Sequence, residues 1–204
     1  GFICGCGTYI LYKNEVLFSQ TVPFEIGNEL LSDLEKYNIE WLLEGEKTLY
    51  YRNKPYITHI GDFKDEQKYL YPSAYKELEP SKASDLVFDK FCIGIHKNSD
   101  FKSFEAKYSK IFTIIDRGNN FYEIVPANCS KATGMEFLMK HFNVDKKDTI
   151  AIGDSTNDLT MLEFAGTSIA MKHSSPIVLE KADYVTDDVF DDGIYNAMKH
   201  FELI

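Results

Sequence analysis

The chain has 204 residues, of which 44% are hydrophobic, so it can bury one sizeable core or a core with a smaller companion domain. Its 32 acidic residues outnumber its 22 basic ones, and the formal charge of -10 argues against a nucleic-acid partner because phosphate backbones would be repelled. Apolar runs are too short to span a bilayer and no secretory leader pattern opens the chain, which predicts no membrane partner and a cytoplasmic location.

The cysteines and histidines do not form a recognisable metal-binding pattern. The four cysteines contain no Cys-x-x-Cys pair, and the five histidines contain no His-x-x-x-His pair. We therefore expect reduced, mostly buried thiols and no zinc site.

The first two thirds of the chain predict a mixed α/β unit. Apolar residues on either side of the turn formers Lys13 and Asn14 indicate a hairpin, whereas the Tyr-rich stretch from Gly61 to Pro80 has no clean period and is predicted as loop with some helix. The expected strands are 2–7, 8–12, 16–18, 39–43, 48–51, 91–95 and 111–115, and the expected helices are 23–37 and 101–108.

After residues 121–126 the pattern becomes a strict alternation of helix and strand. Ser130 can cap a helix that continues through Phe142, and Gly166 can close the helix 157–165. The remaining expected elements are strands 149–152, 167–171 and 184–185 and helices 176–182 and 193–201. Repeated units of this length predict a parallel sheet with helices packed on its faces.

The most informative segment is the acidic string that follows strand 149–152. A glycine turn places Asp154 just beyond the carboxyl end of this strand, where open α/β sheets bind ligands. Asp158 lies four residues later, so the two carboxylates can fall on one side of the turn. Two converging carboxylates with no sulfur or imidazole nearby favour a hard cation such as Mg²⁺.

Two simpler interpretations stay open at this point. Asp, Ser, Thr and Asn are also the preferred helix-capping residues, so the string could do nothing more than start a helix. Lys131, near the start of the preceding helix, gains nothing from the helix dipole and would make sense facing an anionic ligand, although it could be an ordinary solvated lysine.

These residues resemble a known family. Lys131, the string 153–158, and the segments 161–162, 168–171, 182–186 and 192–193 closely resemble the carboxy-terminal signature of Cof-type phosphatases of the haloacid dehalogenase-like hydrolase superfamily. The opening segment 1–12 resembles the family's third core strand and the hairpin into its cap.

The resemblance implies an α/β fold, in which part of a doubly wound, Rossmann-like parallel-sheet core carries an inserted α/β cap domain. Residues 1–12 would be a core strand and the start of the hairpin, residues 13–120 the cap, and residues 121–204 the carboxy-terminal half of the core. The amino-terminal part of the core would lie outside this chain.

The resemblance also implies roles for single residues. Lys131 would neutralise the transferring phosphoryl group, and Asn157 would hold a phosphate oxygen. Asp154 would bind Mg²⁺ directly, and Asp158 would support the metal through water or the lysine through a hydrogen bond. The implied reaction is hydrolysis of a small phosphorylated metabolite, a phosphomonoester, through an aspartyl-phosphate.

The sequence departs from the family at the nucleophile, because no Asp-x-Asp motif occurs in it. Lys172-His173 also stands where relatives usually have Gly-Asn, and Cys6 where many have Asn; we give His173 no role. A second interpretation is therefore a catalytically inactive relative that binds a metabolite or a protein. A third is another phosphoryl-transfer enzyme with the same loop, such as a phosphomutase or an ion-pump domain.

Two further expectations concern partners and the cap. Without its neighbouring first strand, the strand that ends before Asp154 would expose a sheet edge, which predicts self-association or pairing with a missing amino-terminal segment. Four cap residues could contact substrate but more simply fill the cap core, namely Trp41, Tyr50, Tyr51 and His59.

Overall fold

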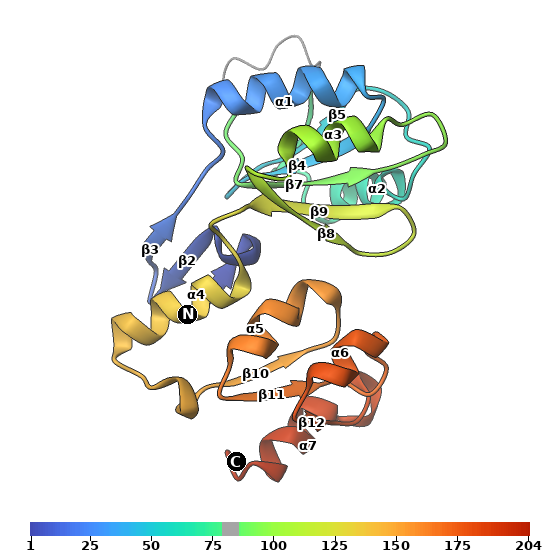
Figure 1. Ribbon diagram of the computed structural model, residues 1–204. Helices are drawn as coiled ribbons and strands as arrows, with labels where there is room; N and C mark the ends of the chain where they lie inside the picture. The colour runs from blue at the N-terminus through green and yellow to red at the C-terminus, as the bar shows by residue number, and fades with distance from the viewer. Residues whose placement is uncertain (79–85) are drawn as a thin grey trace. The chain divides into compact units, whose positions relative to one another are not determined.

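The computed structural model describes residues 1–78 and 86–204, which form two compact units, residues 1–129 and 130–204 (Figure 1). The last two residues of the predicted loop 61–80 lie outside the described residues. The rest of that stretch contains helix α2 (Ile60–Leu70), as expected in part, and strand β6 (Tyr75–Leu78), which we did not predict. Across the described ranges, no helix combines the length and hydrophobicity needed to cross a bilayer.

The first unit is built on a six-stranded sheet of order β6-β5-β4-β7-β9-β8, in which only the pair β5 and β6 is parallel. Helices α1 (Phe24–Lys36) and α3 (Phe101–Tyr108) pack on one face of it. The other strands are β4 (Glu40–Glu44), β5 (Leu49–Arg52), β7 (Lys90–Gly94), β8 (Phe112–Asp116) and β9 (Phe121–Pro126).

The alternation of side chains along β4 explains how both faces of this sheet are covered. Trp41 and Leu43 enter the main core with apolar residues of α1 and α3, whereas Leu42 packs with Tyr51 and Ile60 in a second cluster at the start of α2. Trp41 and Tyr51 are fully buried, so the expectation that they fill the core is confirmed.

A small antiparallel sheet precedes this core. Strands β1 (Phe2–Cys4), β2 (Tyr9–Tyr12) and β3 (Glu15–Ser19) pair in chain order, and Lys13 and Asn14 form the predicted hairpin turn with positive φ. The first strand ends at Cys4 rather than at residue 7, because residues 5–7 turn through three left-handed positions.

A buried cluster of charges ties this opening segment to the large sheet. The Lys90 ammonium lies 2.6 Å from Glu44 Oε1 and 3.0 Å from Glu123 Oε1, and the Cys6 thiol donates to Glu123 Oε1 at 3.1 Å. Burial would lower the pKa of Lys90, but the surrounding negative charge, that of Glu44 first, raises it above its ordinary value. Lys90 therefore stays charged inside the unit.

The second unit contains the predicted parallel sheet. Strands β10 (Ile150–Gly153), β11 (Thr167–Ala170) and β12 (Tyr184–Val185) pair in chain order, and Gly153 lies opposite Ala170. The helices are α4 (Lys131–Phe142), α5 (Leu159–Phe164), α6 (Pro176–Lys181) and α7 (Gly193–His200).

Local signals at two helix ends can be compared with their predicted roles. Ser130 caps α4 as expected, since its hydroxyl accepts from the Thr133 N–H at 3.1 Å and Thr133 Oγ1 accepts from the Ser130 N–H at 2.9 Å. Gly166 has a different reason to be glycine, because a Cβ there would lie 2.3 Å from the Lys146 carbonyl oxygen. Close approach of two backbones, rather than helix termination, requires it.

One predicted boundary differs from the observed division. Residues 121–126 form β9, which pairs with both β7 and β8 in the large sheet, so the structure groups them with the first unit and not with the segment 121–204. An apolar strand next to a regular α/β pattern gives no local sign of which sheet it joins. The division of residues 1–120 at residue 12 stays a prediction.

A fully buried carboxylate organises one end of the large sheet. Glu40, at the start of β4, is 0% exposed and forms an ion pair with Arg52 at 2.5 Å. Its oxygens also accept from the N–H groups of Ile57 and Thr58, each at 2.8 Å, and from the Thr58 hydroxyl at 2.6 Å. Glu40 therefore fixes the loop that follows β5 with charge-assisted hydrogen bonds.

We expect Glu40→Ala to lower the free energy of unfolding of the first unit by about 3–5 kcal/mol, because Arg52 would stay buried without its counter-charge. Trp41 is the only tryptophan in the sequence and is fully buried, so urea unfolding followed by its fluorescence measures this unit. Glu105→Ala, on the exposed surface of α3, is the matched control and should change the value by less than about 0.5 kcal/mol. Equal midpoints for the two variants would contradict the prediction.

Candidate functional site

The acidic string lies where β10 passes into α5. Gly153 ends β10, Asp154 follows at its carboxyl end, and residues 156–158 form a 3-10 turn that leads into α5. A Cβ at Gly153 would lie 2.5 Å from the Asp158 Cβ, so only glycine lets the turn fold back this closely on the strand. The sequence Gly-Asp-Ser therefore places Asp154 at the ligand-binding edge of the parallel sheet.

Asp158 is the buried centre of this turn. Its Oδ2 accepts from the N–H groups of Asp154 at 2.9 Å and Ser155 at 3.1 Å, while its Oδ1 pairs with the Lys131 ammonium. Burial alone would raise its pKa, but the hydrogen bond from Lys131 and those from the two backbone N–H groups hold the pKa below the usual value for aspartate. Asp158 is thus an anion at neutral pH.

Lys131, the first residue of α4, turns its ammonium toward the acidic string at residues 153–158, which is called the acidic loop from here on. Besides its ion pair with Asp158, the ammonium lies 3.5 Å from Asn157 Oδ1, which also accepts from the Ser155 hydroxyl at 2.9 Å. The structure thus brings together Lys131, Asn157 and Asp158, three of the four residues singled out from the sequence. The ion pair is one of the two arrangements expected for Asp158.

Asp154 has a different environment from Asp158. It is exposed, and its carboxylate makes no hydrogen bond or ion pair with another residue of the described ranges. It lines a cavity of about 440 Å³ together with Met171, His173 and Asp188 and the apolar side chains of Ile152, Val189 and Ile194. The loop therefore holds one carboxylate engaged by the protein and one that faces a cavity.

This donor set fits a hard divalent cation, although in a more open form than predicted. Both oxygens of Asp158 are engaged by protein donors, so Asp154 is the carboxylate that can take a metal directly. No group of three or more His, Cys, Asp or Glu residues within the described ranges is placed to enclose a metal ion. Mg²⁺ tolerates such a site, since it commonly keeps several waters and is held by only one or two carboxylates together with phosphate oxygens of the substrate.

Sequence reasoning missed a second pair at the same cavity. His173 Nδ1 contacts Asp188 Oδ2, and both residues line the cavity with Asp154. The Phe190 N–H, and then His173, lower the pKa of Asp188 below its ordinary value. One signal was available, because His173 follows the carboxyl end of β11 much as Asp154 follows that of β10.

The environment of Asp158 predicts a pH-dependent contribution to stability. Because its pKa is lowered in the folded state, the stabilisation is present above the ordinary aspartate pKa of about 4 and is lost as the pH falls through the lower folded value. Asp158→Asn should therefore cost the second unit about 1.5–3 kcal/mol near neutral pH, and less on acidification.

Urea unfolding followed by hydrogen exchange in peptides from residues 130–204 would measure this difference. Asp145→Asn is the control, since that side chain is 75% exposed. A gap between wild type and Asp158→Asn that stays constant down to about pH 3 would contradict the assigned cause.

Comparison with known proteins places these observations in a family. YxeH of Bacillus subtilis (strain 168) is 33% identical over 207 residues, which cover 97% of this chain and 77% of YxeH. YkrA of the same organism is 28% identical over 207 residues and covers all of this chain and 76% of its own length. Both proteins carry phosphatase names.

Solved structures agree with the fold. A haloacid dehalogenase-like hydrolase from B. subtilis has a TM-score of 0.80 at 20% identity over 97% of this chain and 78% of its own. The sugar phosphatase BT4131, described as a member of subclass IIB, has a TM-score of 0.79 at 23% identity over 98% of this chain and 74% of its own. These likenesses confirm the predicted α/β class with a Rossmann-like core and a cap. The model of haloacid dehalogenase-like hydrolases matches residues 1–198, and the chain therefore belongs to this family of enzymes.

Proposed function

We propose that this chain supplies the metal carboxylate, the phosphate-facing lysine and the cap of an Mg²⁺-dependent phosphomonoester hydrolase that acts on a small phosphorylated metabolite. The observation that carries the proposal is the acidic loop after β10, where Lys131 is held by Asp158 while Asp154 faces a cavity. Membership of the hydrolase family supports it. One structural neighbour is described as a sugar phosphatase, so phosphorylated sugars are the first substrates to test.

The residues of the loop divide the work of phosphate binding. Asp158 orients the Lys131 ammonium within the loop, and we assign this positive charge to the neutralisation of the phosphoryl oxygens. Asn157 lies beside Lys131, with its carbonyl oxygen 3.5 Å from the ammonium, and we assign it to the phosphate-binding side of the loop. Asp154 would hold Mg²⁺, which when bound neutralises charge on the phosphoryl group.

The nucleophile of the proposed reaction is not in this chain. An aspartyl-phosphate route needs an aspartate in line with the phosphoryl group, and the sequence contains no Asp-x-Asp motif. The chain spans 76% of YkrA and 77% of YxeH, which leaves room in those relatives for a further segment. We propose that such a segment supplies the nucleophile and the neighbouring core strand. The four cysteines form no disulfide, which is consistent with the cytoplasm as the location of the protein.

We predict that a polypeptide carrying both this chain and an Asp-x-Asp segment hydrolyses para-nitrophenyl phosphate in the presence of Mg²⁺, and that EDTA stops the reaction. Asp154→Ala should abolish turnover, because the carboxylate that holds the metal is lost. Asp145→Ala, an exposed aspartate of the same unit, is the matched control and should keep the activity. Unchanged turnover in Asp154→Ala would refute the assignment of the metal site.

A second function is favoured by the missing nucleophile: an inactive relative that binds a phosphorylated metabolite or a protein. The same assays separate the two functions. The inactive relative would be stabilised against heat by a phosphorylated sugar while releasing no phosphate, and this stabilisation would weaken on changing Lys131 to Ala.

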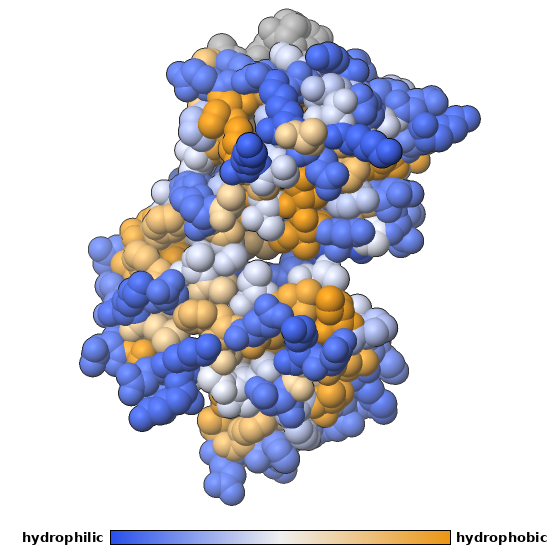
Figure 2. All heavy atoms as spheres, viewed as in Figure 1, coloured by the Kyte–Doolittle hydropathy of each residue, from blue (hydrophilic) through white to orange (hydrophobic). Residues whose placement is uncertain are grey.

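The edge of the parallel sheet is the proposed contact for a missing segment or a second copy. β10 is an outer strand of the sheet β10-β11-β12 in the part of the chain that the structure describes. Val189 and Ile194, which line the cavity at the carboxyl end of β10, are 64% and 51% exposed. Figure 2 shows hydrophobic residues at the surface of this unit among hydrophilic ones. An unpaired strand edge beside exposed apolar groups favours association.

We therefore expect residues 1–204 alone to self-associate in solution. Mass measurement under native conditions over a range of protein concentrations tests this. A stable monomer at all concentrations would contradict it, and addition of a segment that completes the sheet should dissociate the oligomer.

A further inference from the structure

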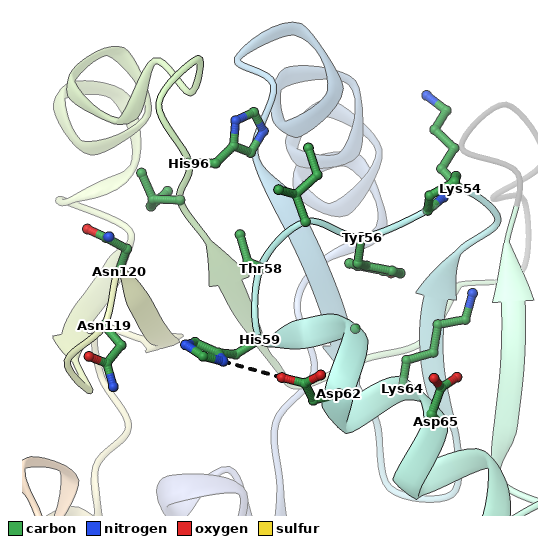
Figure 3. A pocket seen from close by; sticks show the side chains of 14 residues that line it. Lys54, Tyr56, Thr58, His59, Asp62, Lys64, Asp65, His96, Asn119 and Asn120 are labelled. Carbon is green, nitrogen blue, oxygen red and sulfur yellow. Dashed lines mark hydrogen bonds and ion pairs between the residues drawn. The ribbon is translucent and has the colours of Figure 1, made fainter.

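A separate cavity of about 690 Å³ lies within the first unit, far in sequence from the acidic loop. The loop after β5, the start of α2 and the turn between β8 and β9 surround it (Figure 3). A smaller cavity of about 280 Å³ adjoins it and shares His59, Asp62 and Asn119 with it. Of the four cap residues considered from the sequence, His59 is the one that is exposed and lines these cavities.

The buried Glu40 carboxylate anchors the loop after β5, which forms one wall of this cavity. Glu40 binds the N–H groups of Ile57 and Thr58, and Thr58 lies so close to β7 that a Cβ on Gly94 would be 2.1 Å from its Oγ1. Arg52 adds a hydrogen bond to the Pro55 carbonyl oxygen at 2.8 Å. The loop that lines the cavity is therefore pre-organised, which reduces the entropic cost of binding a ligand.

The polar groups that line the cavity include both donors and acceptors. His96 Nδ1 accepts from the Asn98 N–H at 3.3 Å, so in the neutral ring Nε2 carries the proton and donates. His59 Nδ1 lies 3.3 Å from Asp62 Oδ2, so when it donates there Nε2 is an acceptor. Figure 3 draws the His59 ring between Asp62 and Asn119.

Two adjacent amides complete the set. Asn119 and Asn120 both hold positive φ in the turn between β8 and β9, and both line the cavity. Within the described residues, neither side-chain amide makes a hydrogen bond to another side chain or to the backbone. An amide offers a donor and an acceptor side by side, which matches the hydroxyl groups of a polyol.

The charge of the cavity argues against a phosphate group as its occupant. Lys54 is paired with Glu35 at 2.5 Å and Lys64 with Glu77 at 3.2 Å, so the positive charges of both lysines are already matched. Asp62 and Asp65 add negative charge to the lining. An anion would be repelled here, whereas an uncharged ligand would not be.

We propose that this cavity binds an uncharged, polyhydroxylated small molecule, a sugar or a polyol, through His59, His96, Asn119 and Asn120. Each hydroxyl of such a ligand both donates and accepts, and the four side chains together offer both functions: His96 a donor, His59 an acceptor and each asparagine amide one of each. The side chains of Tyr56 and Ile95 supply apolar surface for its C–H groups. The proposal does not depend on phosphatase activity, since the cavity lies wholly within residues 1–129.

Isothermal titration of the chain with methyl α-glucoside, myo-inositol and sorbitol, with inorganic phosphate as a fourth probe, tests the proposal. We expect at least one of the uncharged probes to bind and phosphate not to bind at this cavity. Hydrogen exchange should then show protection in peptides covering residues 54–59 and 117–120, and none in residues 130–204.

Asn119→Gly with Asn120→Gly removes both amides while tolerating positive φ, and should weaken binding of that probe about tenfold. Asn53→Gly, an exposed asparagine of the same loop that does not line the cavity, is the matched control and should leave affinity unchanged. If the glycine pair unfolds the unit, Asn119→Asp with Asn120→Asp keeps the side-chain size and should weaken binding as well. Absence of binding by every uncharged probe, protection confined to residues 130–204, or unchanged affinity in the paired variants would overturn the proposal.

Discussion

The carboxylate of Asp158 is the group on which the candidate site depends. It is buried where two backbone N–H groups and one ammonium meet, so it stays ionised and fixes the path of the loop and the direction of Lys131 at once. Loss of any one of these donors would leave a buried charge short of partners, which is more costly than the bond itself. Because Asp158 makes the hydrogen bonds that hold the turn, the exposed Asp154 carboxylate is left to face a cavity.

Much of the second unit could be predicted because its rules are local. Period-2 and period-3.6 patterns locate strands and helices, Ser130 marks a helix start, and the glycine turn after β10 places Asp154 at the edge of a parallel sheet. What the pattern could not show is where the Asp158 side chain points. An aspartate at this position suits a metal ligand and a turn-capping residue equally well. Only the hydrogen bonds that its Oδ2 accepts from two backbone N–H groups distinguish these roles.

The first unit was less predictable because its sheet depends on pairing between distant segments. β9 reads as an apolar strand next to a regular α/β pattern, yet it pairs with β7 and β8, and β6 is a short edge strand in a polar region. The link between Glu40 and the loop after β5 joins residues up to 18 positions apart through a buried carboxylate, which composition alone does not reveal. The contact between His173 and Asp188 likewise requires the fold.

The distribution of thiols has a practical consequence. None of the four cysteines forms a disulfide, and all lie in the first unit, where Cys4 is exposed and Cys6, Cys92 and Cys129 are buried. A thiol-reactive label should therefore modify Cys4 quickly, and the other three only when this unit opens. Since residues 130–204 contain no cysteine, labelling kinetics would report the opening of one unit without interference from the other.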